Sequence, residues 1–199
     1  MEMAARFRGF LPVVIDLETG GFDPNTHAIL EIAIVQVCFS EDRLVTGARW
    51  HQPVAPYEGS VMDPAALKVT GIDPFDPDRG AIDESLALKE MFRLVRSAVK
   101  HEHCQRAILV AHNASFDQQF LNQAVARNRV KRNPFHPFSF IDTASLAAVA
   151  YGHTVLSEAC ARAGIAFDAD RAHNALYDAE RTAELFCSVV NDWSLRGNH

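Results

Sequence analysis

The chain has 199 residues, of which 48% are hydrophobic and 22% are charged, and its formal net charge is −6. This length and composition are typical of a folded domain, and we expect one domain over residues 1–199. They exclude a disordered chain and a fibrous repeat. The negative net charge by itself argues against a polyanionic partner, because domains that bind phosphate backbones are usually basic.

The cysteines and the hydropathy pattern bear on the cellular location. The four cysteines lie far apart without a C-x-x-C pair, which indicates neither a disulfide framework nor a zinc site. Free thiols fit a reducing cytoplasm. No apolar stretch reaches the length of a transmembrane helix, and the run over residues 11–15 is followed at once by acidic residues. We therefore expect a cytoplasmic protein that does not associate with membranes.

The first half of the chain predicts strands followed by a long loop. Residues rich in Val, Ile, Leu and aromatic side chains predict three strands, and the polar residues 40–42 predict a hairpin turn between the last two. The stretch from 52 to 80 is rich in proline and predicts loop around a short helix. The predicted strands span residues 11–17, 29–39 and 43–51, and the short helix spans residues 64–70.

The second half alternates between helix and strand patterns. Apolar residues recur at helical spacing from about 82 to 103, and a buried strand and an amphipathic helix follow. Together with the first three strands, this order predicts an α/β domain with a mixed central β-sheet flanked by helices. The predicted elements are strands over 108–111 and 138–141 and helices over 116–128, the alanine-rich stretch after 141, 154–163 and 174–193.

Two carboxylates stand at the end of the first predicted strand. Residues i and i+2 of a strand point to the same face, so Asp16 and Glu18 can both reach one cation. Gly20 and Gly21 follow, and we expect them to end the strand and to let a ligand approach the backbone. Taken alone, an Asp-x-Glu pair is more often only the exit of a strand into solvent.

Two further segments carry acidic residues at element boundaries. Asp117 follows a strand and a turn, and we expect Asn113 and Ser115 to cap the helix that begins there. His173 and Asp178 are five residues apart, so on one helix they would differ by roughly 140° around the axis. They can share a site only if His173 lies before the helix.

These four carboxylates and one histidine fit metal-dependent hydrolysis of a phosphodiester. Only hard oxygen donors are present, which favours Mg²⁺ or Mn²⁺ over Zn²⁺. Two such ions can clamp the attacking and leaving oxygens, with Asp16 between them. His173, with an ordinary pKa near 6.5, can take a proton from the attacking water. The other eight histidines, including His112 and His136, have no comparable context and read as structural or surface residues.

In this order, the motifs resemble those of the DEDDh family of 3′ to 5′ exonucleases. The resemblance assigns Asp16 and Glu18 to the first motif, Asp117 to the second, and His173 and Asp178 to the third, all five as catalytic residues and the four acids as metal ligands. It implies a ribonuclease H-like fold and two Mg²⁺ ions per subunit, with Mn²⁺ as a substitute. The implied products are nucleoside 5′-monophosphates.

Other segments resemble one branch of this family over nearly the whole chain. That branch consists of homodimeric exoribonucleases that trim the 3′ ends of transfer RNA and other stable RNA precursors and also degrade single-stranded DNA. Where its members carry a glutamate and a further phenylalanine, this chain has Ala65 and Val69. The resembling segments are Arg6-Phe-Arg-Gly-Phe10, Gly71-Ile-Asp-Pro74, Asp76-Pro-Asp-Arg-Gly80, Arg132-Asn-Pro-Phe-His-Pro-Phe138 and residues 167–178.

The same resemblance implies which residues contact the substrate. Basic residues of one subunit would form a platform that feeds RNA into the partner's active site, and phenylalanines would stack on the bases. The chain's basic residues cluster in the matching stretches despite the net negative charge. The expected basic platform is Arg6, Arg8, Lys100, Arg106, Lys131 and Arg132, and the expected stacking residues are Phe22, Phe116 and Phe138.

Two alternatives stay open at this point. Within the same chemistry, the chain could be another DEDDh enzyme, either an oligoribonuclease or the proofreading subunit of a DNA polymerase. From a different class, it could be a catalytically inactive nucleic-acid-binding module. An inactive scaffold would have no need to keep mutually repelling carboxylates together, which argues against the second alternative.

Overall fold

The computed structural model describes residues 2–195, and a five-stranded sheet of order β3-β2-β1-β4-β5 forms its centre. The β1–β2 and β2–β3 pairs are antiparallel, whereas β4 lies parallel to both β1 and β5. The predicted mixed sheet is therefore confirmed. The strands are β1 (Phe10–Thr19), β2 (Ile29–Ser40), β3 (Arg43–Pro53), β4 (Arg106–Ala111) and β5 (Phe135–Asp142).

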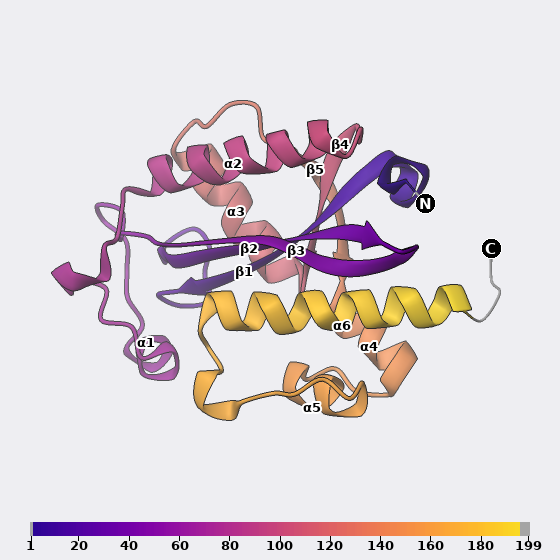
Figure 1. Cartoon of the computed structure of the whole chain (residues 1–199). Coiled ribbons are helices and arrows are strands. Elements are labelled where there is room, and N and C mark those ends of the chain that lie inside the picture. The colour runs from indigo at the N-terminus through magenta and orange to yellow at the C-terminus, as the bar shows by residue number, and fades with distance from the viewer. Residues whose placement is uncertain (1, 196–199) are drawn as a thin grey trace.

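Helices cover both faces of this sheet (Figure 1). On one face lie α2 and α3, and on the other lies the long α6 with α4 and α5 beyond it. The short α1 lies to one side, in the loop region between β3 and α2. The helices are α1 (Pro64–Thr70), α2 (Glu84–His101), α3 (Ser115–Arg127), α4 (Thr143–Tyr151), α5 (Leu156–Arg162) and α6 (Ala175–Leu195). Short 3₁₀ turns span Met3–Ala5, Phe7–Gly9, Pro77–Arg79 and Ala169–Arg171.

The central position of β1 follows from its sequence. Its apolar residues are almost completely buried because helices pack on both faces of the sheet, so the strand reads as a continuous apolar run. Large side chains from the helices, including Phe92 and Phe186, fill the space on either side. The acidic residues of β1 are thus carried by the central, buried strand of the sheet.

Two local expectations were wrong. Neither Asn113 nor Ser115 caps α3; instead Asp142 at the end of β5 accepts hydrogen bonds from the backbone N–H groups of Asn113 and Ala114, at 2.9 and 3.2 Å. Asp142 also caps α4, the next helix, by accepting from Ala144 and Ser145. α3 therefore has no side-chain cap, and the turn before it is held by a distant carboxylate that β5 brings beside it. In addition, β5 starts at Phe135 rather than at residue 138, since Phe135 pairs with Ala107.

The glycines after β1 end the strand, as expected, and other segments pack closely against them. A Cβ on Gly20 would lie 2.5 Å from the Met62 sulfur, and a Cβ on Gly21 would lie 2.4 Å from the His27 ring. Gly21 also has a φ of +158°. The two glycines therefore allow close packing of neighbouring protein segments at the end of β1. Among residues 2–195, no helix is long and apolar enough to cross a membrane.

Candidate active site

Three segments bring carboxylates together at the end of β1. Carboxylate oxygens of Asp16, Glu18 and Asp178 all lie within 4.8 Å of one another. Asp16 and Glu18 share a face of β1 through the two-residue period of the strand, and Asp178 comes from the first turn of α6, which packs on β1. Three negative groups at this separation repel one another strongly unless protons or cations offset their charge.

Asp117 joins this cluster from the opposite face of the sheet. It sits in the first turn of α3 with 4% of its surface exposed, and its Oδ1 accepts a hydrogen bond of 3.1 Å from the Leu17 backbone N–H. Leu17 lies between Asp16 and Glu18, so this bond fixes Asp117 against the acidic end of β1. Electrostatic coupling of Asp117 to Asp16 and Glu18 agrees with this placement.

The start of α6 holds His173 and Asp178 in a fixed relation. Asn174 caps the helix by accepting from the Tyr177 N–H at 3.0 Å, and the helix begins at Ala175. His173 therefore precedes the helix, as expected, with a left-handed φ of +63°. Its backbone N–H donates to Asp178 Oδ2 at 2.9 Å, and its exposed side chain lines a hollow shared with Glu31.

Burial and mutual repulsion shift the proton affinities of the acidic residues. Burial, and then the charges of Asp178, Glu31 and Asp117, raise the pKa of Glu18 to about 8. Burial raises the pKa of Asp117 to about 8, although its backbone hydrogen bonds act in the opposite direction. Burial first and the neighbouring carboxylates second also raise the pKa of Asp16 well above its ordinary value. Without cations, the cluster holds protons near neutral pH.

The donor set fits hard divalent cations. Asp178 Oδ1 is buried and has no hydrogen-bond partner, although buried oxygens normally have one. Carboxylate oxygens are the ligands of Mg²⁺ and Mn²⁺, whereas zinc sites usually carry Cys or His. A cation between Asp16, Glu18 and Asp178 would satisfy the orphaned oxygen and offset the repulsion. This carboxylate cluster is where a divalent metal fits.

One acidic residue near the site was missed by the sequence analysis. Glu31 of β2 lies opposite Glu18 in the β1–β2 ladder, and its charge contributes to the raised pKa values of Asp16 and Glu18. His51 Nε2 lies 3.2 Å from Glu31 Oε2, but the geometry does not make a hydrogen bond. In the sequence, Glu31 could have been noticed as the single charged residue inside the apolar run of residues 29–37.

The expected stacking residues fall into two groups. Phe22 is 78% exposed, and its ring lies 6.3 Å from that of Phe116, which directly precedes Asp117 in α3. Phe138 is 77% exposed but belongs to another group of rings, in which His136 lies 4.6 Å from Phe138 and 5.4 Å from Phe10. The structure thus brings Phe22 and Phe116 together beside the carboxylates and leaves Phe138 with the aromatic residues at the start of β1.

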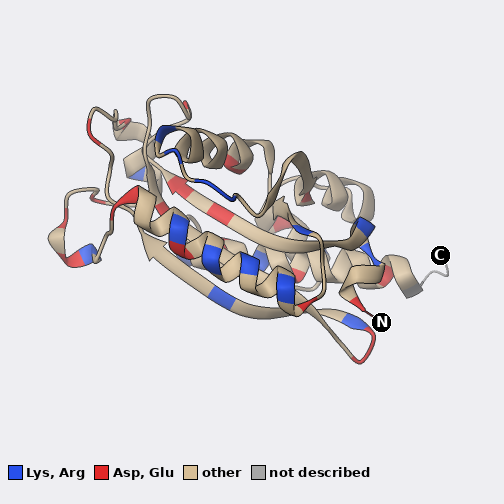
Figure 2. Cartoon of the chain, turned by 90° about the horizontal axis from the view of Figure 1, so that it is seen from above, with Lys and Arg blue, Asp and Glu red and all other residues tan. Residues whose placement is uncertain are grey.

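The expected basic platform gathers away from the carboxylates. Lys100, Arg106 and Arg132 line one hollow, and the Arg8 guanidinium lies over the ring of Phe10, the strand partner of Arg106. Lys131 is exposed next to Arg132. The Arg6 guanidinium instead donates a hydrogen bond to the Ser194 hydroxyl, near the C-terminal end of α6. Four Lys and Arg residues spaced along one face of α2 extend this basic surface (Figure 2). They are Lys89, Arg93, Arg96 and Lys100.

Comparison with solved structures identifies the fold. Escherichia coli Exonuclease I in complex with a dT13 oligonucleotide superposes with a TM-score of 0.72 at 18% identity, over 94% of this chain and 43% of that one. A full-length 3′-exonuclease superposes with a TM-score of 0.72 at 21% identity, over 92% of this chain and 62% of that one. This chain therefore spans less than two thirds of either protein. The shared fold is the ribonuclease H-like fold of the DEDDh exonucleases.

Comparison with curated sequences is more specific. The family described as Exonuclease matches residues 13–186. Ribonuclease T of Shewanella frigidimarina (strain NCIMB 400) is 54% identical over 193 residues, which cover 96% of this chain and 87% of that protein. Ribonuclease T of Escherichia coli (strain K12) is 53% identical over 193 residues, which cover 96% of this chain and 90% of that protein. The chain therefore belongs to the ribonuclease T family of 3′ to 5′ exonucleases.

Proposed function

We propose that this 3′ to 5′ exoribonuclease removes terminal nucleotides from transfer RNA and other stable RNA precursors, and that it also degrades single-stranded DNA. The observation that carries the proposal is that carboxylate oxygens of Asp16, Glu18 and Asp178 lie within 4.8 Å of one another. Asp117 is held beside them by a hydrogen bond from the backbone N–H of Leu17, the residue between Asp16 and Glu18. Relatives named Ribonuclease T at 53–54% identity support RNA as the substrate. The reducing cytoplasm is the proposed location, where the four thiols stay free.

The four carboxylates would hold two Mg²⁺ ions, or Mn²⁺ in their place. Asp16, Glu18 and Asp178 would bind one ion, and Asp16 with Asp117 would bind the second. When bound, such ions supply charge stabilisation for the attacking and leaving oxygens of the scissile phosphate. The protein's own contribution is to keep these acids fixed: Leu17 N–H holds Asp117, and His173 N–H holds Asp178. Fixed ligands need no rearrangement when the substrate arrives.

His173 would act as the general base. Its side chain is exposed at the edge of the cluster and lines the hollow that Glu31 also faces, so water can reach the ring. The backbone of His173 is fixed by Asp178, and this bond keeps the ring close to the acidic residues without using its nitrogens. An imidazole is the side chain best suited to accept a proton from water near neutral pH.

The phenylalanines would hold the 3′-terminal bases. Phe22 and Phe116 present adjacent rings next to Asp117, and each stacked base contributes roughly 1–3 kcal/mol with little dependence on its identity. Phe138 would stack on a base that lies nearer the basic platform. Val69 is exposed on α1, where its aliphatic side chain offers a smaller surface to a base than an aromatic ring.

A homodimer would connect the basic platform to the active site. Arg106 pairs with Phe10 at the start of β1, and the carboxylates lie at the other end of that strand. Asp16 follows Phe10 by six positions along the strand, which corresponds to roughly 20 Å. This separation supports a partner subunit that presents its platform to the active site, because the two features of one chain lie at opposite ends of the sheet.

A comparison of three substrates tests the proposed function. We expect Mg²⁺-dependent release of nucleoside 5′-monophosphates from a transfer RNA precursor with an extended 3′ end, and from single-stranded DNA. Preference for a dinucleotide would indicate an oligoribonuclease instead, and preference for a mismatched DNA primer would indicate a proofreading enzyme. Binding of RNA without any hydrolysis in the presence of Mg²⁺ or Mn²⁺ would indicate an inactive binding module.

A further inference from the structure

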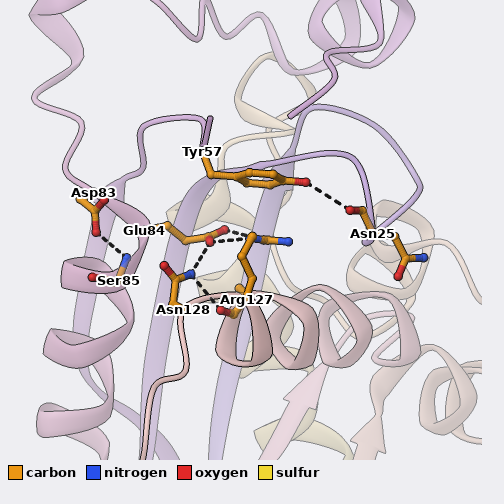
Figure 3. A network of polar contacts seen from close by, with 8 residues as sticks. Asn25, Tyr57, Asp83, Glu84, Ser85, Arg127 and Asn128 are labelled. Atoms are coloured by element: carbon orange, nitrogen blue, oxygen red, sulfur yellow. Dashed lines mark hydrogen bonds and ion pairs between the residues drawn. The ribbon is translucent and has the colours of Figure 1, made fainter. Parts of the chain in front are cut away.

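A buried ion pair joins α2 to α3 (Figure 3). Glu84, at the start of α2, is 3% exposed, and both of its carboxylate oxygens accept from the Arg127 guanidinium, at 2.8 and 3.0 Å. Asn128 adds a third hydrogen bond of 2.6 Å to Glu84. Such a two-point contact fixes both the position and the plane of the guanidinium.

Tyr57 packs on this fixed guanidinium. The Arg127 guanidinium carbon lies 3.9 Å from the centre of the Tyr57 ring, within the range of a cation–π contact. At the far end of the ring, the Tyr57 hydroxyl donates a hydrogen bond of 3.3 Å to the backbone carbonyl oxygen of Asn25 (Figure 3). The ion pair, the aromatic ring and the Asn25 carbonyl therefore form one continuous chain of contacts.

Asn25 lies in the loop that carries Phe22. We call residues 20–28, between β1 and β2, the Phe22 loop. Its two ends are already held, because Val61 N–H donates to Thr26 and Asp63 N–H donates to Gly20. Within the loop, the Asp23 carboxylate accepts from Asn25 and Thr26 and forms a compact turn. The Tyr57 hydroxyl thus anchors this turn to α3, through the Arg127 guanidinium on which the Tyr57 ring packs.

The same helix carries the other ring of the stacking pair. Phe116 lies in the first turn of α3, and Arg127 lies at its last residue. Tyr57 therefore ties the loop with Phe22 to the helix with Phe116, and the two rings meet edge to face at 6.3 Å. A loop free to move relative to α3 would have to lose conformational entropy when a base inserts beside these rings.

We infer that Tyr57 is a positioning residue, which holds the Phe22 loop in the conformation that stacks the 3′-terminal base, with the Glu84–Arg127 pair as its support. The inference rests on the proposed role of Phe22 in substrate binding. Tyr57 does not touch the carboxylate cluster, so its effect falls on substrate binding rather than on the hydrolytic step.

The test compares steady-state kinetics of Tyr57→Phe, Phe22→Ala and the double variant on a single-stranded RNA tail. Tyr57→Phe removes only the hydroxyl and keeps the ring on Arg127. We expect it to raise KM roughly 2- to 10-fold, the usual range for one hydrogen bond, with kcat nearly unchanged. Phe22→Ala should raise KM roughly 5- to 150-fold through the lost stacking. In the Phe22→Ala background, Tyr57→Phe should have almost no further effect, because the two residues act through one contact.

Tyr151→Phe is the matched control. This variant also loses one tyrosine hydroxyl, which in the parent protein lies 2.9 Å from Ser188 Oγ, between α4 and α6. The KM of the variant should equal that of the parent protein. A Tyr57→Phe protein with unchanged KM overturns the inference. So does a KM increase that persists undiminished beside Phe22→Ala, since it would reflect general loosening. If Phe22→Ala itself leaves KM unchanged, the stacking role proposed for Phe22 fails, and the positioning role falls with it.

Discussion

Glu18 on β1 and Glu31 on β2 lie directly opposite each other in the antiparallel ladder, at the edge of a cluster that already contains three other carboxylates. Like charges in this position destabilise a sheet, typically by ~0.2–1 kcal/mol. Among residues 2–195, neither glutamate forms an ion pair with Lys or Arg, and the basic side chain beside Glu31 is that of His51, at 3.2 Å. This arrangement is costly for the isolated protein and is relieved when cations bind.

Glu31→Gln should make the cluster easier to ionise. The charge of Glu31 is one cause of the raised pKa of Glu18, so its removal lowers that pKa. A cross-strand energy of up to ~1 kcal/mol corresponds to a shift of about 0.7 pH unit or less. We expect the pH at which Mg²⁺ binding is half-maximal to fall by that amount, as measured by calorimetric titration across pH. Glu41→Gln, in the exposed hairpin turn between β2 and β3, is the control and should leave the pH dependence unchanged.

The metal-free protein should lose stability as the pH rises. The folded-state pKa values of Glu18 and Asp117, both about 8, lie above their ordinary values of 4.5 and 3.8. Between roughly pH 4 and pH 8 the folded protein therefore binds more protons than the unfolded chain, and the free energy of unfolding falls with rising pH. Each kcal/mol lost lowers Tm by about 2–4 °C at this size.

Thermal unfolding in the presence of a chelator measures this effect directly. We expect Tm to be several degrees lower at about pH 8 than at about pH 5.5. Added Mg²⁺ should raise Tm more at the higher pH, because metal binding then displaces fewer protons. A Tm that rises with pH in the presence of the chelator would contradict the raised pKa values of Glu18 and Asp117.

Asp178 and His173 should separate metal binding from proton transfer. Asp178→Asn removes a ligand charge and should weaken metal binding and abolish cleavage. His173→Asn should lower kcat by roughly 10²- to 10⁴-fold and leave metal affinity nearly intact, because the backbone N–H that holds Asp178 remains. Asn is preferred to Ala here since the φ of +63° is left-handed.

Calorimetric titration with Mn²⁺ and single-turnover cleavage check the two variants side by side. Equal loss of metal affinity in both would show that His173 supports the ligands instead of accepting a proton.

Charge reversal on the platform should weaken RNA binding in a salt-dependent way. Lys131→Glu with Arg132→Glu removes two phosphate contacts, and the slope of log K against log salt should become shallower by roughly 1.4, at about 0.7 per contact for a single strand. Fluorescence anisotropy of a labelled RNA across salt concentrations measures this slope. Arg43→Glu, at the start of β3, changes the net charge without touching the platform and should keep the parent slope.

A mixing experiment tests whether the platform acts across a dimer. Asp178→Asn subunits keep their platform, and Lys131→Glu/Arg132→Glu subunits keep their catalytic residues. Mixed dimers should regain activity that neither variant has alone, since one intact platform then faces one intact active site. If activity does not recover although mass spectrometry shows subunit exchange, then the basic platform and the active site that serve one RNA belong to the same subunit.

The fold class could be predicted from the sequence and is confirmed, and the chemistry proposed for the site also comes from sequence patterns. Strand and helix periods follow local rules, so the mixed sheet flanked by helices was predicted, and the spacing of Asp16 and Glu18 placed both on one face of β1. The requirement that His173 precede its helix followed from helical geometry in the same way. Oxygen-only donors pointed to hard cations without any coordinates.

Only the tertiary structure decided which distant residues complete the site. Glu31 reaches the cluster through strand register, Asp142 of β5 holds the turn before α3, and Tyr57 reaches the Phe22 loop over the Arg127 guanidinium. Gly20 and Gly21 are explained by Met62 and His27, which pack against them from elsewhere in the chain. Sequence periodicity reports the direction of a side chain within its own element, but a contact between elements depends on how they pack, which no local pattern encodes.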